Sequence, residues 1–442
     1  MAWLAVENQK LAYQRLNQKA LRADSYKNVR EATEERRRDL APREDGMYPD
    51  DNHQPTIGRK ILSSSYVGSP RWYHSQFQDG MAIVREYHKP DYFLTMTCNS
   101  RWPEITDNLE VGQTAQDRPD LVARVFKQKK DQLMNDLIHG QILGKVVAHM
   151  NVIEFQKRGL PHVHILIILA SDDRSTTPED VDMAICAELP PDPEQADTEE
   201  ERLQRQRLED IVVKNMVHGP CGSFNPSCPC MENGRCTKNF PKPFQKETIV
   251  DPDNHSPTYR RRSMEDGGRQ ITCTKTGHTI DNRWIVPYNP FLSLRYNCHI
   301  NNERCTSVTG CKYLYKYVTK GSDRAMVATS VEGRERDEIS QYEDLRSVGS
   351  SEAAWHLMTF PIARRFPPVQ TLRVHTEDQQ QVVFDEGTEE EALERQRETE
   401  LTAFFQHNAD QNQQEEPDKL TYIDMTKLFR YDKSKKQWIR RK

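Results

Sequence analysis

The sequence predicts an α+β fold in which helices flank a central antiparallel sheet, and three stretches carry this prediction. Residues 145–169, KVVAHMNVIEFQKRGLPHVHILIIL, are two β-branched, apolar runs joined by a short turn, the pattern of an antiparallel hairpin. Residues 92–98, YFLTMTC, predict another strand. Apolar side chains at helical spacing predict a long helix over residues 119–139. The histidine-bearing strand of the hairpin is expected near the centre of the sheet.

The hairpin also carries the first candidate site. Side chains alternate between the two faces of a strand, so His162 and His164 point the same way, and Glu154 and Gln156 share a face of the partner strand. Two nitrogens and one oxygen of this kind bind a divalent ion and leave positions open for a substrate oxygen. The alternative is a pair of histidines that are simply satisfied, but an unpaired couple on so apolar a strand would be costly to bury.

Length and composition indicate several domains and long solvated segments. The 442 residues allow two or three domains, while 36% hydrophobic residues and a mean hydropathy of −0.87 are low for one compact globule. No apolar run is long enough to span a bilayer, and no signal-peptide pattern opens the chain. We therefore expect a soluble intracellular protein with no membrane partner.

The formal net charge of −5 conceals a strong asymmetry. Residues 171–210 carry −10 and residues 376–418 carry −12, so the remaining residues carry +17. A basic folded part favours a polyanionic partner such as nucleic acid. The two acidic segments are expected to be solvated linkers or exposed helices.

These changes in composition divide the chain into six segments. The first is rich in Arg, Lys, Glu and Gln, which predicts either a helical arm along a phosphate backbone or a plain solvated helix. The segments are a charged helical arm (1–60), the first part of the core (61–170), an acidic linker (171–215), a Cys/His-rich insert (216–245), a DNA-binding and tyrosine segment (246–325) and a C-terminal extension (326–442).

Ten cysteines without a secretion signal indicate reduced thiols or metal ligands rather than disulfides. Five candidate zinc ligands fall within nineteen residues of a loop rich in glycine and proline: His218, Cys221, Cys228, Cys230 and Cys236. Such a loop can wrap one tetrahedral zinc ion, although the spacing is not that of two C-x-x-C knuckles. The alternative is a reduced loop whose cysteines only pack.

Two further stretches combine basic or polar groups with aromatic side chains. Arg260, Arg261 and Arg262 follow a tyrosine, a pattern that predicts a phosphate clamp or, alternatively, an exposed loop. Residues 284–301, WIVPYNPFLSLRYNCHIN, are expected to lie around a half-buried strand. Their polar side chains are candidates for hydrogen bonds to unpaired bases: Arg295, Asn297, His299 and Asn301.

The second chemical element is residues 311–321, CKYLYKYVTKG. On a helix with about 100° per residue, Tyr313, Lys316, Tyr317 and Lys320 lie within an arc of about 100°, opposite the apolar side chains. A tyrosine pair at this spacing is often only packing. Lysines beside it favour a functional interpretation, because an ammonium group stabilises a phenolate and attracts phosphate.

Tyrosines, metal ligands and a basic surface together suggest one reaction. A tyrosine oxygen would attack a DNA phosphodiester while a metal polarises the phosphoryl oxygens, which leaves a phosphotyrosine and a free hydroxyl end. Two tyrosines permit two successive transfers. A zinc hydrolase of small molecules would leave the +17 excess and the tyrosine face without a role.

Ordered sequence blocks then identify a family resemblance. The blocks are DYFLTMTCNSRWPEI (91–105), EFQKRGLPHVHIL (154–166), HGPCG (218–222), PCM (229–231), FPKPF (240–244), WIVPYNPFL (284–292), KYLYKYVTKG (312–321) and EDLRSVGSSEAAWHLMTFPI (343–362). Together they resemble the Rep nuclease region of Helitron transposases, eukaryotic rolling-circle elements of the HUH endonuclease superfamily. The resemblance runs from about residue 62 to residue 383 and so covers most of the chain.

The resemblance implies a nuclear enzyme with a ferredoxin- or RRM-like HUH core that nicks single-stranded DNA at transposon ends and transfers the strand. It implies that His162 and His164 hold Mg²⁺ or Mn²⁺ and that Tyr313 and Tyr317 are the two nucleophiles. By its position on the facing strand, Glu154 is the expected third metal ligand.

Other assignments are less direct. Gln156 is the substitute for Glu154 as a ligand, and Lys316 and Lys320 are candidates for lowering the phenol pKa. Cys228 stands where a small polar residue is expected, which leaves the set of zinc ligands open. Family members usually continue into a superfamily-1 helicase, and this sequence shows no Walker motif, so we expect a helicase domain C-terminal to it.

Two rival functions keep the same residues. A viral or plasmid replication initiator would use the same chemistry, although the additional loop blocks favour the transposon enzyme. A domesticated, catalytically inactive copy would retain only DNA binding, but the intact histidine and tyrosine pairs argue against such decay.

Overall fold

A computed structural model gives the architecture of the chain. It describes residues 2–17, 23–25, 29–30, 33–34, 62–155, 159–174, 177–219, 221–250, 257–272, 277–305, 338–344, 348–384, 388–395, 398–411 and 420–441. The chain forms two compact units. One comprises Tyr73–Arg324 and Ser347–Val369, and the other comprises Met1–Trp72, Ala325–Arg346 and Gln370–Lys442. The first unit holds the predicted sheet.

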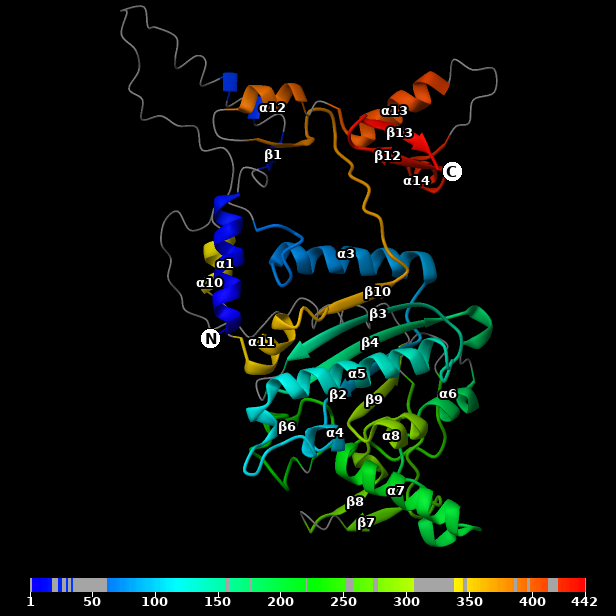
Figure 1. Ribbon diagram of the computed structural model, residues 1–442. Helices are drawn as coiled ribbons and strands as arrows, with labels where there is room; N and C mark the ends of the chain where they lie inside the picture. Colours follow the sequence, from blue (N-terminus) through cyan, green and yellow to red (C-terminus); the bar gives the residue numbers. More distant parts are fainter. Residues whose placement is uncertain are drawn as a thin grey trace, which may run out of the picture. The chain divides into compact units, whose positions relative to one another are not determined.

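The core of that unit is a five-stranded sheet in the order β10-β3-β4-β2-β9, and every neighbouring pair is antiparallel (Figure 1). The strands are β2 (Tyr92–Thr97), β3 (Val146–Phe155), β4 (Pro161–Leu169), β9 (Ile300–Arg304) and β10 (Ala363–Phe366). The prediction of an α+β fold with a central antiparallel sheet is confirmed. The histidine-bearing strand β4 lies in the middle, and all nine of its residues are buried.

Helix α5 (Pro119–Ile138) covers one face of the sheet, as its apolar spacing predicts. Its buried Phe126, Leu133 and Leu137 belong to the same core as Val163 and Ile165 of β4. Helix α11 (Ser350–Leu357) joins this face through the buried Trp355, whose ring contacts Phe126. Burial of each such side chain contributes roughly 1.5–3 kcal/mol, so this face is the main source of stability.

Helix α3 (Pro70–Tyr87) packs on the other face. Its Ile83 and Val84 form a second core with Leu166 and Ile168 of β4. Since side chains alternate along a strand, His162 and His164 lie on this α3 face and not on the α5 face. The candidate metal ligands and the larger core therefore occupy opposite sides of the sheet.

The described residues of the segment 171–215, predicted as an acidic linker or exposed helices, are helical in part and are not simply solvated. The segment contains α6 (Pro178–Ala184) and α7 (Glu199–Asn215), with short 3₁₀ turns at Ser171–Asp173 and Pro193–Gln195. Leu208 and Val212 of α7 are buried in a third core, which also contains residues of the Cys/His-rich loop. Three or four apolar residues on one stripe are enough to dock a helix whose other faces are charged.

The segment 284–301 also differs from the expected strand. After a 3₁₀ turn at Asn282–Trp284, residues Pro290–Tyr296 form helix α8, and only β9 is extended. The side chain of Asn289 caps this helix by accepting a hydrogen bond from the Leu292 amide at 3.0 Å. Further short elements complete the unit: α4 (Pro103–Thr106), η2 (Ala115–Asp117), β5 (Met231–Glu232), β6 (Arg235–Cys236), β7 (Gln270–Thr272) and β8 (Thr279–Asp281).

The other unit has small cores of its own. Its elements are α1 (Ala2–Leu16), β1 (Ala23–Ser25), α10 (Glu338–Asp344), β11 (Gln381–Val383), α12 (Glu389–Arg395), α13 (Glu400–Gln411), α14 (Tyr422–Leu428), β12 (Phe429–Asp432) and β13 (Gln437–Arg440). The expected N-terminal helix is present, but it buries Trp3 and Leu11, so it is not simply solvated. Phe404, Met425 and Trp438 form another core. In the described residues, no helix has the length and apolarity needed to cross a membrane.

Candidate metal centres

The first candidate centre lies where three strands meet side by side. The Cα register pairs His162 with Glu154 on β3 and with Thr97 on β2, and it pairs His164 with Thr95 one step further along β2. Residues directly opposite in antiparallel strands share a face of the sheet. The two histidines, the two threonines and the glutamate therefore form one polar patch, which we call the sheet site.

Hydrogen bonds orient the rings of the sheet site. Thr97 Oγ1 and His162 Nδ1 are 2.8 Å apart, and Thr95 Oγ1 and His164 Nδ1 are 3.0 Å apart. The Phe93 ring also stacks on the His164 ring with a centroid distance of 5.8 Å. Partners on Nδ1 leave Nε2 as the ligand atom, which is the arrangement of metal-binding histidines in general.

The Nε2 atom of His162 is buried and has no hydrogen-bond partner among the described residues. Burial, with smaller contributions from nearby His164 and His299, lowers the pKa of His162 to about 4, so the ring is neutral at pH 7. In the tautomer in which Nδ1 donates to the Thr97 hydroxyl, the Nε2 of the neutral ring carries a lone pair that a metal ion can bind. This atom fits a divalent ion at the site.

The contact between His164 and Glu154 supports the same interpretation. His164 Nε2 lies 2.8 Å from Glu154 Oε2. When His164 Nδ1 donates to Thr95, both atoms of this contact are acceptors, so a proton or a metal ion must lie between them. Glu154 is thus placed as the predicted third donor. Gln156, its predicted substitute, lies outside the described residues.

The second candidate centre is the group of His218, Cys221, Cys230 and Cys236, which we call the thiol cluster. Its four ligand atoms all lie within 4.8 Å of one another, and it is the one such group of three or more in the described ranges. Ligands of a tetrahedral zinc ion are separated by about 3.3–3.8 Å, so a small contraction would close the cluster on zinc.

The structure selects four of the five predicted zinc ligands. Cys228 is outside the thiol cluster, although its sulfur lies 3.5 Å from that of Cys230. His218 Nε2 lies 3.3 Å from Cys236 Sγ, and its ring stacks on Phe240 at 4.2 Å. The cluster can therefore bind a metal such as zinc with three sulfurs and one nitrogen.

The thiols of the cluster influence one another. Burial, with further contributions from the neighbouring thiols, raises the pKa of Cys230 to about 12. Burial also acts on Cys236, but hydrogen bonds from the Phe240 and Lys238 amides outweigh it and the pKa of Cys236 is lowered. A bound cation would offset the repulsion between neighbouring thiolates and so lower their pKa, because a coordinating thiol is deprotonated.

The three predicted phosphate-clamp arginines are engaged inside the fold. Arg262 and Arg260 both pair with the buried carboxylate of Glu188, at 2.7 and 3.2 Å. Arg261 is only 5% exposed and donates to three backbone carbonyls, among them that of Ile285 at 2.7 Å. Arg261 is therefore placed for a structural role rather than for contact with phosphate. DNA binding by the other two stays a prediction.

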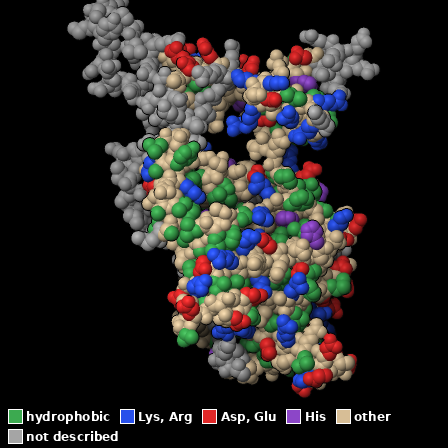
Figure 2. All heavy atoms as spheres, viewed as in Figure 1, with side chains coloured by type: hydrophobic (Ala, Val, Ile, Leu, Met, Phe, Trp, Pro, Cys, Tyr) green, Lys and Arg blue, Asp and Glu red, His purple; other side chains and the backbone are tan. Residues whose placement is uncertain are grey.

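The remaining predicted DNA ligands are also placed within the first unit. Arg295 pairs with Asp136 of α5, and Asn297 is the left-handed residue, at φ 43°, that ends α8. His299 Nδ1 bonds the Asn215 carbonyl at 2.8 Å. Figure 2 shows basic and acidic side chains interspersed over the visible face, so the predicted basic excess is not gathered into one patch there.

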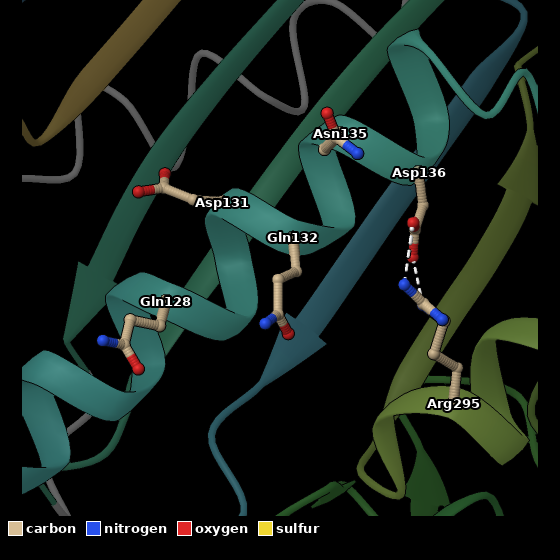
Figure 3. A pocket seen from close by; sticks show the side chains of 6 residues that line it. All are labelled: Gln128, Asp131, Gln132, Asn135, Asp136 and Arg295. Atoms are coloured by element: carbon tan, nitrogen blue, oxygen red, sulfur yellow. Dashed lines mark hydrogen bonds and ion pairs between the residues drawn. The ribbon is translucent and has the colours of Figure 1, made fainter.

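Figure 3 shows the shallow pocket beside Arg295. It is lined by Gln128, Asp131, Gln132, Asn135, Asp136 and Arg295. Asp136 neutralises Arg295 and also accepts a hydrogen bond from the Tyr296 hydroxyl. The pocket lies on α5, which covers the sheet face opposite to the sheet site, and its carboxylates do not suit a phosphate group.

The predicted catalytic helix lies outside the residues that the structure describes, and this holds for Tyr313, Lys316, Tyr317 and Lys320.

Sequence reasoning missed Thr95 and Thr97, which orient the histidines. A signal was available, because T-x-T in one strand matches H-x-H in its neighbour at the same spacing of two.

Together, the fold and the site define an α+β protein with a histidine-carboxylate group on its central sheet and a thiol cluster beside it. Among the comparisons with known proteins, residues 1–167 match the family model described as the Helitron helicase-like domain at the N-terminus, so this part of the chain is similar to that family. No curated protein matches the chain. The matched range includes β2, α5, β3 and most of β4.

Proposed function

We propose that this protein is a metal-dependent single-strand DNA endonuclease and strand transferase that initiates rolling-circle transposition. The sheet would be the core of an HUH-type nuclease, with His162, His164 and Glu154 as ligands of Mg²⁺ or Mn²⁺. The observation that carries the proposal is the buried Nε2 of His162, which has no hydrogen-bond partner among the described residues, beside ring nitrogens held by threonines. Satisfied structural histidines would not leave this atom without a partner.

The reaction assigns a role to each group. The Tyr313 or Tyr317 oxygen attacks the phosphorus, the bond from phosphorus to the 3′ oxygen breaks, and the phenol proton ends on the released 3′ hydroxyl. The product is a 5′ phosphotyrosine ester. The other tyrosine cleaves a second phosphodiester in the same way, and a free 3′ hydroxyl then attacks the phosphotyrosine, which re-forms a phosphodiester and releases the tyrosine phenol. A divalent ion at the sheet site would polarise the phosphoryl oxygens. Lys316 and Lys320 would favour the phenolate.

The thiol cluster has a separate role in the proposal. Three sulfurs and one imidazole are a donor set for structural zinc, which closes all four positions to substrate. Zinc at this place would fix a loop that has little regular structure of its own.

The proposal extends to partners and location. The substrate is single-stranded DNA at transposon ends, a helicase domain C-terminal to these residues would expose that strand, and the enzyme would act in the nucleus.

The test is the formation of a covalent adduct. The protein is incubated with 3′-labelled single-stranded oligonucleotides that cover the ends of the encoding element, with Mg²⁺ or Mn²⁺, and products are separated on a denaturing gel. We expect a labelled protein-DNA adduct that EDTA abolishes, and mass mapping should locate it on Tyr313 or Tyr317. Tyr315→Phe is the matched control, because this tyrosine lies on the other side of the predicted helix.

Contrary results separate the alternatives. An adduct that survives the double change Tyr313→Phe/Tyr317→Phe rules out the proposed nucleophiles. Salt-dependent DNA binding without any adduct supports a domesticated, inactive derivative. An adduct on replication-origin hairpins but not on transposon ends supports a replication initiator.

A further inference from the structure

His299 lies between the two candidate centres, and its bonds connect them. It stands just before β9, the edge strand beside β2. Its Nδ1 donates to the backbone carbonyl of Asn215 at 2.8 Å, and Asn215 is the last residue of α7. Asn215 precedes the cluster ligand His218 by only three residues. One end of the connection is therefore attached to the thiol cluster through a very short piece of chain.

The other end reaches the sheet site. The backbone carbonyl of His299 accepts the Thr97 amide at 2.9 Å, and the Thr97 hydroxyl bonds His162 Nδ1 at 2.8 Å. His162, in turn, offers the unpartnered Nε2. The path from His218 to His162 thus contains one short backbone segment and three hydrogen bonds.

The short backbone segment is itself held in place. The Met216 carbonyl accepts the Val286 amide at 2.8 Å, and the His218 amide donates to the Trp284 carbonyl at 2.9 Å. A glycine follows His218, and a Cβ at Gly219 would lie 3.2 Å from the Trp284 ring. A shift of His218 would therefore displace the Asn215 carbonyl rather than be absorbed along the way.

The hydrogen bond to Asn215 also fixes the tautomer of the His299 ring. Burial lowers the pKa of His299 from its usual 6.5, so the ring is neutral at pH 7. A neutral ring donates through one nitrogen only, and the Asn215 carbonyl is the partner that fixes which one.

We propose that His299 is a positioning residue through which the metal-loaded thiol cluster holds the His162 ring in its ligand orientation. This rests on the proposed function, because it assigns an ion to each centre. The rival is that His299 binds the sheet-site ion directly through Nε2. These two roles use different nitrogens of the same ring, so amide substitutions can separate them.

The first experiment measures Mn²⁺ affinity at the sheet site, by electron paramagnetic resonance of free Mn²⁺, in zinc-loaded protein. His299→Asn keeps a donor near the place of Nδ1, so we expect it to bind Mn²⁺ within about threefold of the wild type. His299→Gln and His299→Ala lose that donor, and we expect affinity to fall about tenfold or more. Unchanged affinity in all three variants, or retention by Gln with loss in Asn, overturns the proposal.

The second experiment tests the connection between the thiol cluster and the sheet site without Mn²⁺. Zinc is removed from the wild type by chelation, and amide hydrogen exchange is followed in peptides that contain Thr97. We expect faster exchange of the Thr97 amide after zinc removal, and no such zinc dependence in His299→Ala. Equal exchange with and without zinc in the wild type overturns the coupling. Should the wild type bind no Mn²⁺, the proposed nuclease fails, while this exchange measurement still decides the connection.

Discussion

The sheet site and the thiol cluster hold similar numbers of donors but are built in opposite ways. Glu154 and His162 are paired by strand register, and β2 supplies the hydroxyls that orient the rings. The thiol cluster takes its donors from a loop in which β5 and β6 have two residues each. In the first case the sheet places the ligands before any ion binds. In the second case the loop has little regular structure of its own, so under the proposed function a bound ion would add its binding free energy to the folding free energy of the loop.

The difference is visible in how closely the donors approach. The four atoms of the thiol cluster lie within 4.8 Å of one another, while the sheet site is not among the groups of the described residues that are this compact. A closed, compact set is typical of a structural metal, and a spread set with open positions is typical of a catalytic one. Four substitutions test this contrast, beginning with the largest expected effect.

The largest effect is expected in the thiol cluster. Cys230→Ser should reduce bound zinc from about one equivalent to less than half after dialysis, and thermal unfolding should start at a lower temperature. Cys228→Ser is the control, because its sulfur lies outside the cluster, and it should keep its zinc. Metal analysis and calorimetry measure both. Equal zinc loss in the two variants would show that the ligand set is wrong.

A substitution in the sheet site should reduce DNA cleavage but leave the zinc content unchanged. His162→Ala removes a ligand that the sheet holds, so we expect cleavage to fall on the order of a thousandfold, a loss of several kcal/mol of transition-state stabilisation. Zinc content should stay at the wild-type level. Single-turnover cleavage of a labelled oligonucleotide gives the rate. A variant that loses its zinc as well would erase the contrast between the centres.

A smaller effect is expected from the residues that orient the rings. Thr97→Val keeps the shape but leaves His162 Nδ1 without its hydroxyl partner, which should weaken Mn²⁺ binding about tenfold to a hundredfold. Thr97→Ser keeps the hydroxyl and should bind like the wild type. Titration calorimetry with Mn²⁺ distinguishes them. Equal Mn²⁺ affinity in Thr97→Val and Thr97→Ser would mean that the hydroxyl does not orient the ring.

The smallest effect is expected on the stability of the sheet at acid pH. Burial, with some repulsion by Lys130, lowers the pKa of His149 on β3 from 6.5 to about 4. The unfolded chain therefore binds the proton more readily, and stability should fall as the pH drops from 6.5 towards 4. His149→Phe should flatten this part of the stability curve, measured by urea unfolding at several pH values. An unchanged slope would mean that other groups dominate the acid response.

The periodicity of the sequence predicts the elements on which the sheet site depends. The hairpin, the β2 strand and helix α5 appear at or within one or two residues of the expected bounds, because each has a long, clear apolar pattern. The common face of His162 and His164 and the opposing position of Glu154 follow from strand alternation alone. These are short-range consequences of local geometry.

Other features depend on contacts that a pattern does not reveal. The sequence of residues 171–215 predicts a solvated segment because acidic residues far outnumber basic ones there. Leu208 and Val212 nevertheless pack in a core, and Arg260 and Arg262 neutralise Glu188. Long-range pairs of this kind have no signature in local composition. The choice of four ligands from five likewise depends on how the loop folds and not on its spacing.

Strand pairing at the sheet site has a consequence for how such genes can change. Thr97, His162 and Glu154 lie in one row because three strands are in step. Inserting or deleting a single codon within β2 would turn its threonines towards helix α5 and present Met96 to the histidines. Related sequences can therefore differ by substitutions along these strands. The number of residues between the turns must stay constant wherever the sheet site is kept.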